Sequence, residues 1–174
     1  MYGGAFSLED ALKLVAARGR LIQSLPAGIM CAVMANEARV NQLIEKFRDE
    51  ISIAAVNGAE NVVISGSENA MQQVLADLET QGIKTKQLNV SHAFHSPMLQ
   101  PILAEFEQVA QQVTYHLPQI DLISTLSGQF ATEAIATPAY WCQHLCQSVR
   151  FADGIATLHN AGYQISIECG PSQF

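Results

Sequence analysis

The chain has 174 residues, of which 49% are hydrophobic and 14% charged, and its formal net charge is −7. This length and apolar content suffice for one packed domain or two small lobes. The acidic balance argues against a nucleic-acid or membrane-surface role, because both partners favour a basic face. No stretch reaches the ~18 apolar residues of a membrane span, and the N-terminus does not resemble a signal peptide. We therefore expect a cytoplasmic protein.

The first predicted element is a helix that begins at Ser7 and ends near Leu25. Ser7 is typical of an N-cap, with acidic residues in the first turn after it. Arg18 falls inside the apolar arc of this helix, and an inward-facing arginine needs an anion, because an unpaired buried charge is costly. At ~100° per residue, one apolar stripe runs along the helix and is widened by three further leucines. The stripe is Leu8, Leu12, Val15, Gly19 and Ile22, and the widening residues are Leu14, Leu21 and Leu25.

Residues 27–89 follow the order β-α-β-β-α-β, which is typical of a ferredoxin-like lobe. A turn is expected at Asn57-Gly58. The predicted strands are 28–35, 51–56, 62–65 and 83–90, and the predicted helices are 37–47 and 67–81.

Residues 90–174 return to α/β alternation, and together with residues 1–26 we expect them to form part of a larger α/β lobe. Ser96-Pro97 is typical of a helix start, with proline at the first helical position. The predicted helices of this part are 96–113, 139–147 and 151–161, and the predicted strands are 121–126 and 165–169.

The four cysteines are predicted to be free thiols, because the chain shows no export signal. Two of them, Cys142 and Cys146, are one helical turn apart with His144 between them. His144 would point to a different side of the helix from the two thiols, so no metal site is expected there. The other two cysteines are Cys31 and Cys169.

The segment from Val90 to Pro97 contains His92 and His95 between a predicted strand and a predicted helix. In open α/β folds, ligands bind at this end of the strands. The positive end of the following helix favours a neutral imidazole, which is the form that a general base needs. Two other readings remain: histidines that only occupy a loop, or a zinc pair, for which the segment lacks both a helix and a suitably placed carboxylate.

Five segments of the chain, taken in order, resemble the acyltransferase domain of a modular type I polyketide synthase, a malonyl-CoA:acyl-carrier-protein transacylase. The resemblance runs from end to end and implies an α/β fold: part of an α/β-hydrolase-like larger lobe with an inserted ferredoxin-like lobe. The segments are FSLEDALKLVAARGRLIQ (6–23), IAAVNGAENVVISG (53–66), HAFH (92–95), YWCQHLCQSVRF (140–151) and ECGP (168–171).

The resemblance also implies roles for individual residues. His95, the last residue of HAFH, would be the catalytic base, and Arg18 would bind the malonyl carboxylate. His92 and Phe94 belong to the selectivity motif, in which Phe94 would occupy the space that a methylmalonyl group needs. His144 matches the position whose main-chain carbonyl orients the catalytic imidazole.

The nucleophile of the resembled family is the serine of a G-H-S-x-G elbow, and the sequence contains no G-x-S-x-G motif. We therefore expect the nucleophile to lie upstream of Met1, and the fragment alone to be inactive.

The function implied is transfer of a malonyl unit from malonyl-CoA to the phosphopantetheine thiol of an acyl carrier protein. The partners implied are these two substrates and the adjacent ketosynthase and other synthase domains; no cofactor or metal is expected. The alternatives are a methylmalonyl-type or fatty-acid-synthase acyltransferase, a serine hydrolase that uses the same base, and a catalytically dead binding module built on residues 27–89.

Overall fold

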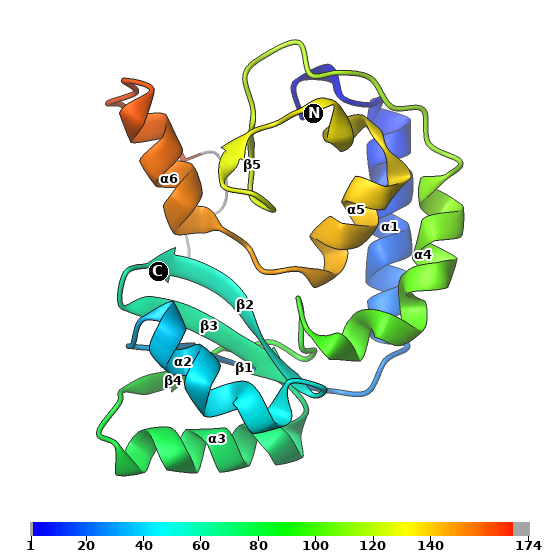
Figure 1. Cartoon of the computed structure of the whole chain (residues 1–174). Coiled ribbons are helices and arrows are strands. Elements are labelled where there is room, and N and C mark those ends of the chain that lie inside the picture. Colours follow the sequence, from blue (N-terminus) through cyan, green and yellow to red (C-terminus); the bar gives the residue numbers. More distant parts are fainter. Residues whose placement is uncertain (1, 169–174) are drawn as a thin grey trace.

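Two hydrophobic cores organise the chain, of which this computed structural model describes residues 2–168 (Figure 1). The first core forms among three helices that lie alongside one another. The second core lies between a sheet and two helices that cover one of its faces. The helices of the first core are α1 (Leu8–Gln23), α4 (Leu103–Ala110) and α5 (Pro138–Cys146).

The sheet of the second core has four strands in the order β2-β3-β1-β4, and every neighbouring pair is antiparallel. The turn expected at Asn57-Gly58 comes two residues later, because both residues remain in β2 and Gly58 pairs with Asn61. Along the chain the elements are β1 (Ile29–Val33), α2 (Glu37–Ile44), β2 (Ile51–Gly58), β3 (Asn61–Gly66), α3 (Glu68–Thr80) and β4 (Thr85–Gln87).

Helices α2 and α3 are fixed by their N-caps and by their apolar faces. The side chains of Asn36 and Ser67 accept hydrogen bonds from the backbone N–H groups of Arg39 and Ala70. The apolar faces of the two helices then meet the alternate side chains of the strands. The most deeply buried members of this core are Val33, Val40, Val62, Ile64, Met71, Val74 and Leu78.

Helix α1 turns only part of the predicted apolar arc to the first core: Leu14, Leu21 and Ile22 are buried as expected. Leu8, Leu12 and Val15 are 58%, 57% and 66% exposed. The helix is apolar on more than one side, and α4 and α5 pack against the neighbouring side. The buried side of α1 consists of Ala11, Leu14, Ala17, Leu21 and Ile22.

The segment predicted as one helix over 96–113 is divided in two. It begins as a 3-10 helix, η3 (Pro97–Ile102), and becomes α-helical only from Leu103. Pro101 lies inside the first part, where it has no backbone N–H to donate and its ring would clash with the previous turn of an α-helix.

Both strands predicted in the last third of the chain differ from the structure. Of residues 121–126, only β5 (Ile123–Ser124) is a strand, which pairs with β6 (Gln129–Phe130) in a small hairpin. Residues 165–168 form no strand, because none of the described strands lies beside them; Ile165 and Ile167 are 87% and 83% exposed. Cys169, the last residue of the predicted strand, lies outside the described residues.

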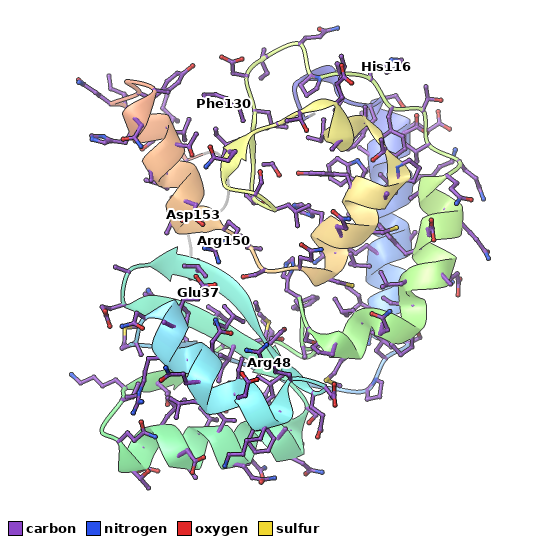
Figure 2. All side chains as sticks on the ribbon, viewed as in Figure 1. Glu37, Arg48, His116, Phe130, Arg150 and Asp153 are labelled. Atoms are coloured by element: carbon purple, nitrogen blue, oxygen red, sulfur yellow. The ribbon has the colours of Figure 1, made fainter. Side chains whose placement is uncertain are left out.

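The connection from α5 to α6 (Phe151–Asn160) joins the two cores. Val149 continues the sheet beside β2: its N–H donates to Ala54 O at 2.8 Å, and its carbonyl accepts from the N–H of Val56 at 2.9 Å. Arg150 forms ion pairs with Glu37 of α2 and with Asp153 of α6, both at 2.7 Å, and these side chains lie close together in Figure 2. Within the described residues, no helix has the length and apolar content needed to cross a bilayer.

Candidate functional site

The loop from Ser91 to Ser96 lies where the two cores meet. The side chain of Phe94 packs against the first core and also against a small cluster on the other face of the sheet, formed by Met30, Ala54 and Val63. Phe94 is therefore held from both sides.

Hydrogen bonds fix the backbone of this loop at three points. The N–H of Gly28 donates to Ser91 O at 3.2 Å, and the buried hydroxyl of Ser96 donates to Ala93 O at 2.7 Å. The hydroxyl of Ser52, on β2, donates to the carbonyl of His95 at 2.6 Å. The position of His95 is thus tied to the sheet as well as to the helix that follows.

His95 has an unusual backbone conformation. Its φ is +54°, the only positive value among the non-glycine residues that the structure describes. Left-handed backbone costs free energy in a residue with a Cβ, and such strain is concentrated at active sites. The anchored loop around His95 supplies the interactions that offset this cost.

The imidazole of His95 is oriented by the carbonyl of Gln147, which lies 2.8 Å from Nδ1. A carbonyl oxygen can only accept, so Nδ1 carries the proton and Nε2 of the neutral ring keeps its lone pair. The resemblance predicts this carbonyl at His144; in the structure it belongs to Gln147, the residue just after α5. There the helix has ended, and the Gln147 carbonyl is available to a partner outside it.

The surroundings of His95 favour its neutral form. Burial lowers the pKa of the imidazole below its ordinary value of 6.5. The bond to Gln147 works in the opposite direction, and the positive charge of Arg18 lowers the pKa further. At neutral pH the ring is therefore poised to accept a proton at Nε2.

Arg18 and His95 face the same cavity, which has a volume of about 420 Å³. Its walls are mostly apolar, and it is open to solvent beside Leu12 and Val15, which are both exposed. The guanidinium carbon of Arg18 lies 5.5 Å from the centre of the Phe94 ring. The remaining lining residues are Phe6, Ala11, Leu12, Leu14, Val15, Phe106, Trp141, His144 and Leu145.

His144 reaches the cavity with its side chain. Its Nε2 lies 3.1 Å from the hydroxyl of Thr125, and its ring lies beside that of Trp141. Burial, with smaller effects from His95 and Arg18, lowers the pKa of His144 to about 4. His144 is therefore an uncharged part of the cavity wall at neutral pH.

His92 is separated from this group. Its side chain is buried, its Nδ1 lies 2.8 Å from the hydroxyl of Ser91, and it is not among the residues that line the cavity.

The thiols and possible metal ligands form no second site in the described part of the chain. Cys31, Cys142 and Cys146 are free, and burial raises the pKa of each, that of Cys146 to about 11. Thiols with raised pKa values are poor nucleophiles at neutral pH. Between residues 2 and 168, no three His, Cys, Asp or Glu side chains lie close enough to hold a metal ion.

Comparison with known proteins identifies the family. The family model described as the acyl transferase domain matches residues 2–172. The chain belongs to this acyltransferase family. It corresponds to a fragment of such a domain from a modular type I polyketide synthase, and its mixed α/β fold matches the solved acyltransferase structures.

Three relatives indicate how much of such a protein the chain represents. It is 47% identical to the spectinabilin polyketide synthase system protein NorB of Streptomyces orinoci over 97% of its own length and 8% of that protein. It is 44% identical, with a TM-score of 0.89, to the acyltransferase domain of the second module of the salinomycin polyketide synthase. It is 32% identical, with a TM-score of 0.84, to the SpnD acyltransferase domain in complex with 2-(pent-4-yn-1-yl)malonyl. The chain is covered to 92% and 91% in these two comparisons, yet spans only 38% of each solved domain.

Two residues of the site have no clear signature in the sequence of this acyltransferase. Gln147 contributes a main-chain carbonyl and Ser52 bonds to a main-chain carbonyl, so neither needs a distinctive residue type. The sequence signal for Gln147 is only its place at the end of the predicted helix 139–147. For Ser52 there was none, because its partner lies 43 residues away along the chain.

Proposed function

We propose that this chain carries the general base and the carboxylate-binding residue of an acyltransferase that moves a malonyl unit from malonyl-CoA to the phosphopantetheine thiol of an acyl carrier protein. The observation that supports this most is the position of Arg18 and His95 on the wall of one apolar cavity. A hydrolase of neutral esters has no use for a cation there, whereas a free carboxylate pairs well with a guanidinium.

The reaction would proceed in two half-reactions. In the first, Nε2 of His95 takes the proton of a serine hydroxyl as the serine oxygen attacks the thioester carbonyl, and the CoA thiolate leaves with that proton. In the second, the same nitrogen takes the proton of the phosphopantetheine thiol, whose sulfur attacks the acyl-serine ester and restores the hydroxyl. The serine would come from a part of the acyltransferase domain outside these 174 residues, which contain no G-x-S-x-G motif.

Arg18 would hold the free carboxylate of the malonyl group throughout, so that the thioester end faces the serine. Phe94 lies against Arg18 and would restrict the space at the α-carbon, which favours malonyl over methylmalonyl. His92 would support this loop from within, since it is buried and bonded to Ser91. We assign no chemical step to the imidazole of His144.

We also infer that residues 27–89 are a ferredoxin-like lobe inserted into a larger lobe made from residues 1–26 and 90–174. The antiparallel order β2-β3-β1-β4 supports the first part. The separate cores support the division between the lobes. The exposed apolar side of α1, with Leu8, Leu12 and Val15, would be covered by the rest of an α/β-hydrolase-like acyltransferase lobe.

The partners of the whole protein would be malonyl-CoA, an acyl carrier protein and neighbouring synthase domains such as a ketosynthase. No cofactor enters this reaction.

A chimera tests the proposal directly. Residues 2–172 replace the matching part of the salinomycin second-module acyltransferase domain, and transfer from CoA thioesters to a carrier protein is measured against the parent domain. His95→Ala should abolish transfer. Arg18→Ala should lower kcat/KM for malonyl-CoA by about 10²-fold or more, because it leaves a carboxylate unpaired in the cavity. It should change transfer of an acetyl group, which has no free carboxylate, much less.

The same chimera separates the alternatives. Equal loss of acetyl and malonyl transfer in Arg18→Ala would contradict the carboxylate role and favour a hydrolase-like site. A chimera that folds and binds the carrier protein but transfers nothing would favour the binding module. Phe94→Ser should raise the methylmalonyl-to-malonyl ratio of kcat/KM by about 10- to 100-fold. An unchanged ratio would favour a methylmalonyl-type or other extender specificity.

A further inference from the structure

We propose that Ser52, on β2, is a positioning residue for His95: its hydroxyl holds the left-handed backbone that directs the imidazole to the carbonyl of Gln147. The inference rests on the proposed function in naming His95 as the general base. It goes beyond that function by assigning the orientation of the base to a strand of the four-stranded sheet.

The side chain of Ser52 lies on the face of the sheet that is turned toward the loop of His95. Its neighbours along the strand, Ile51 and Ile53, pack into the second core on the opposite face, and side chains alternate between the faces of a strand. Ala54, two residues further on, belongs to the small cluster on the loop side. The strand therefore presents the hydroxyl of Ser52 to the loop, where it donates to His95 O at 2.6 Å.

This hydrogen bond acts on the strained backbone of His95 itself. Its acceptor is the carbonyl of the residue whose φ is +54°, so the bond restrains the peptide unit that follows the strained Cα. A residue with a Cβ favours negative φ when nothing restrains it. Such a change at His95 would rotate the Cβ, and the imidazole with it, away from its present direction. The other two anchors of the loop bond to Ser91 and Ala93 instead.

Strand β2 also places the partner of the imidazole. The N–H of Val149 donates to Ala54 O at 2.8 Å, which fixes the backbone two residues after Gln147. The carbonyl of Gln147 lies 2.8 Å from Nδ1 of His95. Both ends of this bond are thus held by one strand, from positions only two residues apart. A general base that is misplaced by about 1 Å can lose about 10²-fold in rate, so the spacing matters for catalysis.

Ser65, on β3, offers a matched control. It is paired with Ser52 in the register of the sheet, and directly paired residues lie on the same face. Ser65 is fully buried, and its hydroxyl has no hydrogen-bond partner among the residues that the structure describes. Ser65→Ala therefore removes the same atom from the next strand without removing a bond to the loop.

The first measurement is the tautomer of His95 in the 174-residue chain, read from NMR of the imidazole nitrogens. The wild type, Ser65→Ala and Ser52→Thr, which keeps a hydroxyl, should hold the proton on Nδ1. Ser52→Ala should show a mixture of the two tautomers, because the Gln147 carbonyl no longer selects one of them.

The second measurement is transfer by the chimera described above. Ser52→Ala should lower kcat/KM about 5- to 100-fold, from the loss of one hydrogen bond to a displacement of the base. The factor should be the same for malonyl-CoA and acetyl-CoA, because the base serves every acyl group.

Each outcome bears on the inference. An unchanged tautomer or an unchanged kcat/KM in Ser52→Ala would overturn it. An equal loss in Ser65→Ala, or no recovery in Ser52→Thr, would assign the effect to packing of the sheet and would also overturn it. If the wild-type chimera transfers nothing, the proposed function fails, and the tautomer still decides whether Ser52 orients His95. Urea unfolding of the variants verifies that they fold.

Discussion

An added methyl group at Gly28 should disturb the loop that holds His95, because Gly28 lies against Ala93 of that loop. A Cβ at Gly28 would lie 2.6 Å from the Cβ of Ala93 and 2.8 Å from its backbone nitrogen. Ordinary carbon contacts are about 3.5–4.0 Å, so the loop would have to move by about 1 Å. Overpacking of this size costs about 1–3 kcal/mol. Gly28→Ala should therefore destabilise the chain and displace the loop that holds His95.

Gly19 provides the matched control, because a Cβ there meets nothing within 4 Å. It lies inside α1, where alanine is about 0.8–1 kcal/mol more favourable than glycine. The same glycine-to-alanine change should thus lower the free energy of unfolding at Gly28 and raise it at Gly19. The free energies of unfolding in urea should differ by about 2–4 kcal/mol between the two variants.

The local consequence is read from the imidazole of His95 by NMR. Gly28→Ala should shift its ring resonances and its pKa, since the bond to Gln147 depends on the loop position. Gly19→Ala should leave both unchanged. If Gly28→Ala proved as stable as Gly19→Ala, with the His95 resonances in place, the steric reasoning about this loop would be wrong.

Three further outcomes are expected. In the unfolded chain His144 becomes protonated below about pH 6.5, whereas burial in the folded chain delays its protonation to about pH 4. The free energy of unfolding should therefore decrease as the pH is lowered from 6.5 to about 4, and it should decrease less in His144→Gln. Equal pH profiles of the two proteins would refute this. Glu37→Gln should cost about 0.5–1 kcal/mol in urea unfolding by weakening the half-buried pair with Arg150, and Glu45→Gln, in a more exposed pair, less than 0.3 kcal/mol. Equal losses of stability in Glu37→Gln and Glu45→Gln would contradict the idea that burial strengthens the Glu37–Arg150 ion pair. The only tryptophan, Trp141, lines the cavity, so malonyl-CoA should change its fluorescence in the wild type but not in Arg18→Ala.

Periodicity predicted the elements whose structure depends on local sequence. Helices α2, α3 and α6 begin and end within three residues of their predicted bounds, because caps and apolar stripes mark them. The helical projection also indicated that Arg18 faces inward, and it lies on the cavity wall. That Arg18 binds a carboxylate remains a prediction.

What depends on distant contacts was harder to predict. The apolar arc of α1 is wider than the side that is buried, and only the packing of the neighbouring helices decides which part of it is covered. Residues 165–168 have the alternation of a strand, yet a strand needs a hydrogen-bonded neighbour, which the sequence pattern does not contain. The carbonyl that orients His95 was placed three residues too early, since a main-chain oxygen has no signature in the residue types.

The four residues from Gln147 to Arg150 connect the loop of His95 to the four-stranded sheet and to α2. The carbonyl of Gln147 is hydrogen-bonded to the imidazole of His95, and Val149 is hydrogen-bonded to β2. Arg150 forms an ion pair with Glu37 of α2. A strain applied to any one of these contacts is transmitted to the other two within a single short stretch of backbone. The segment from Gln147 to Arg150 is therefore an unsuitable crossover point in chimeric acyltransferases. It should be exchanged together with β2 and the HAFH loop.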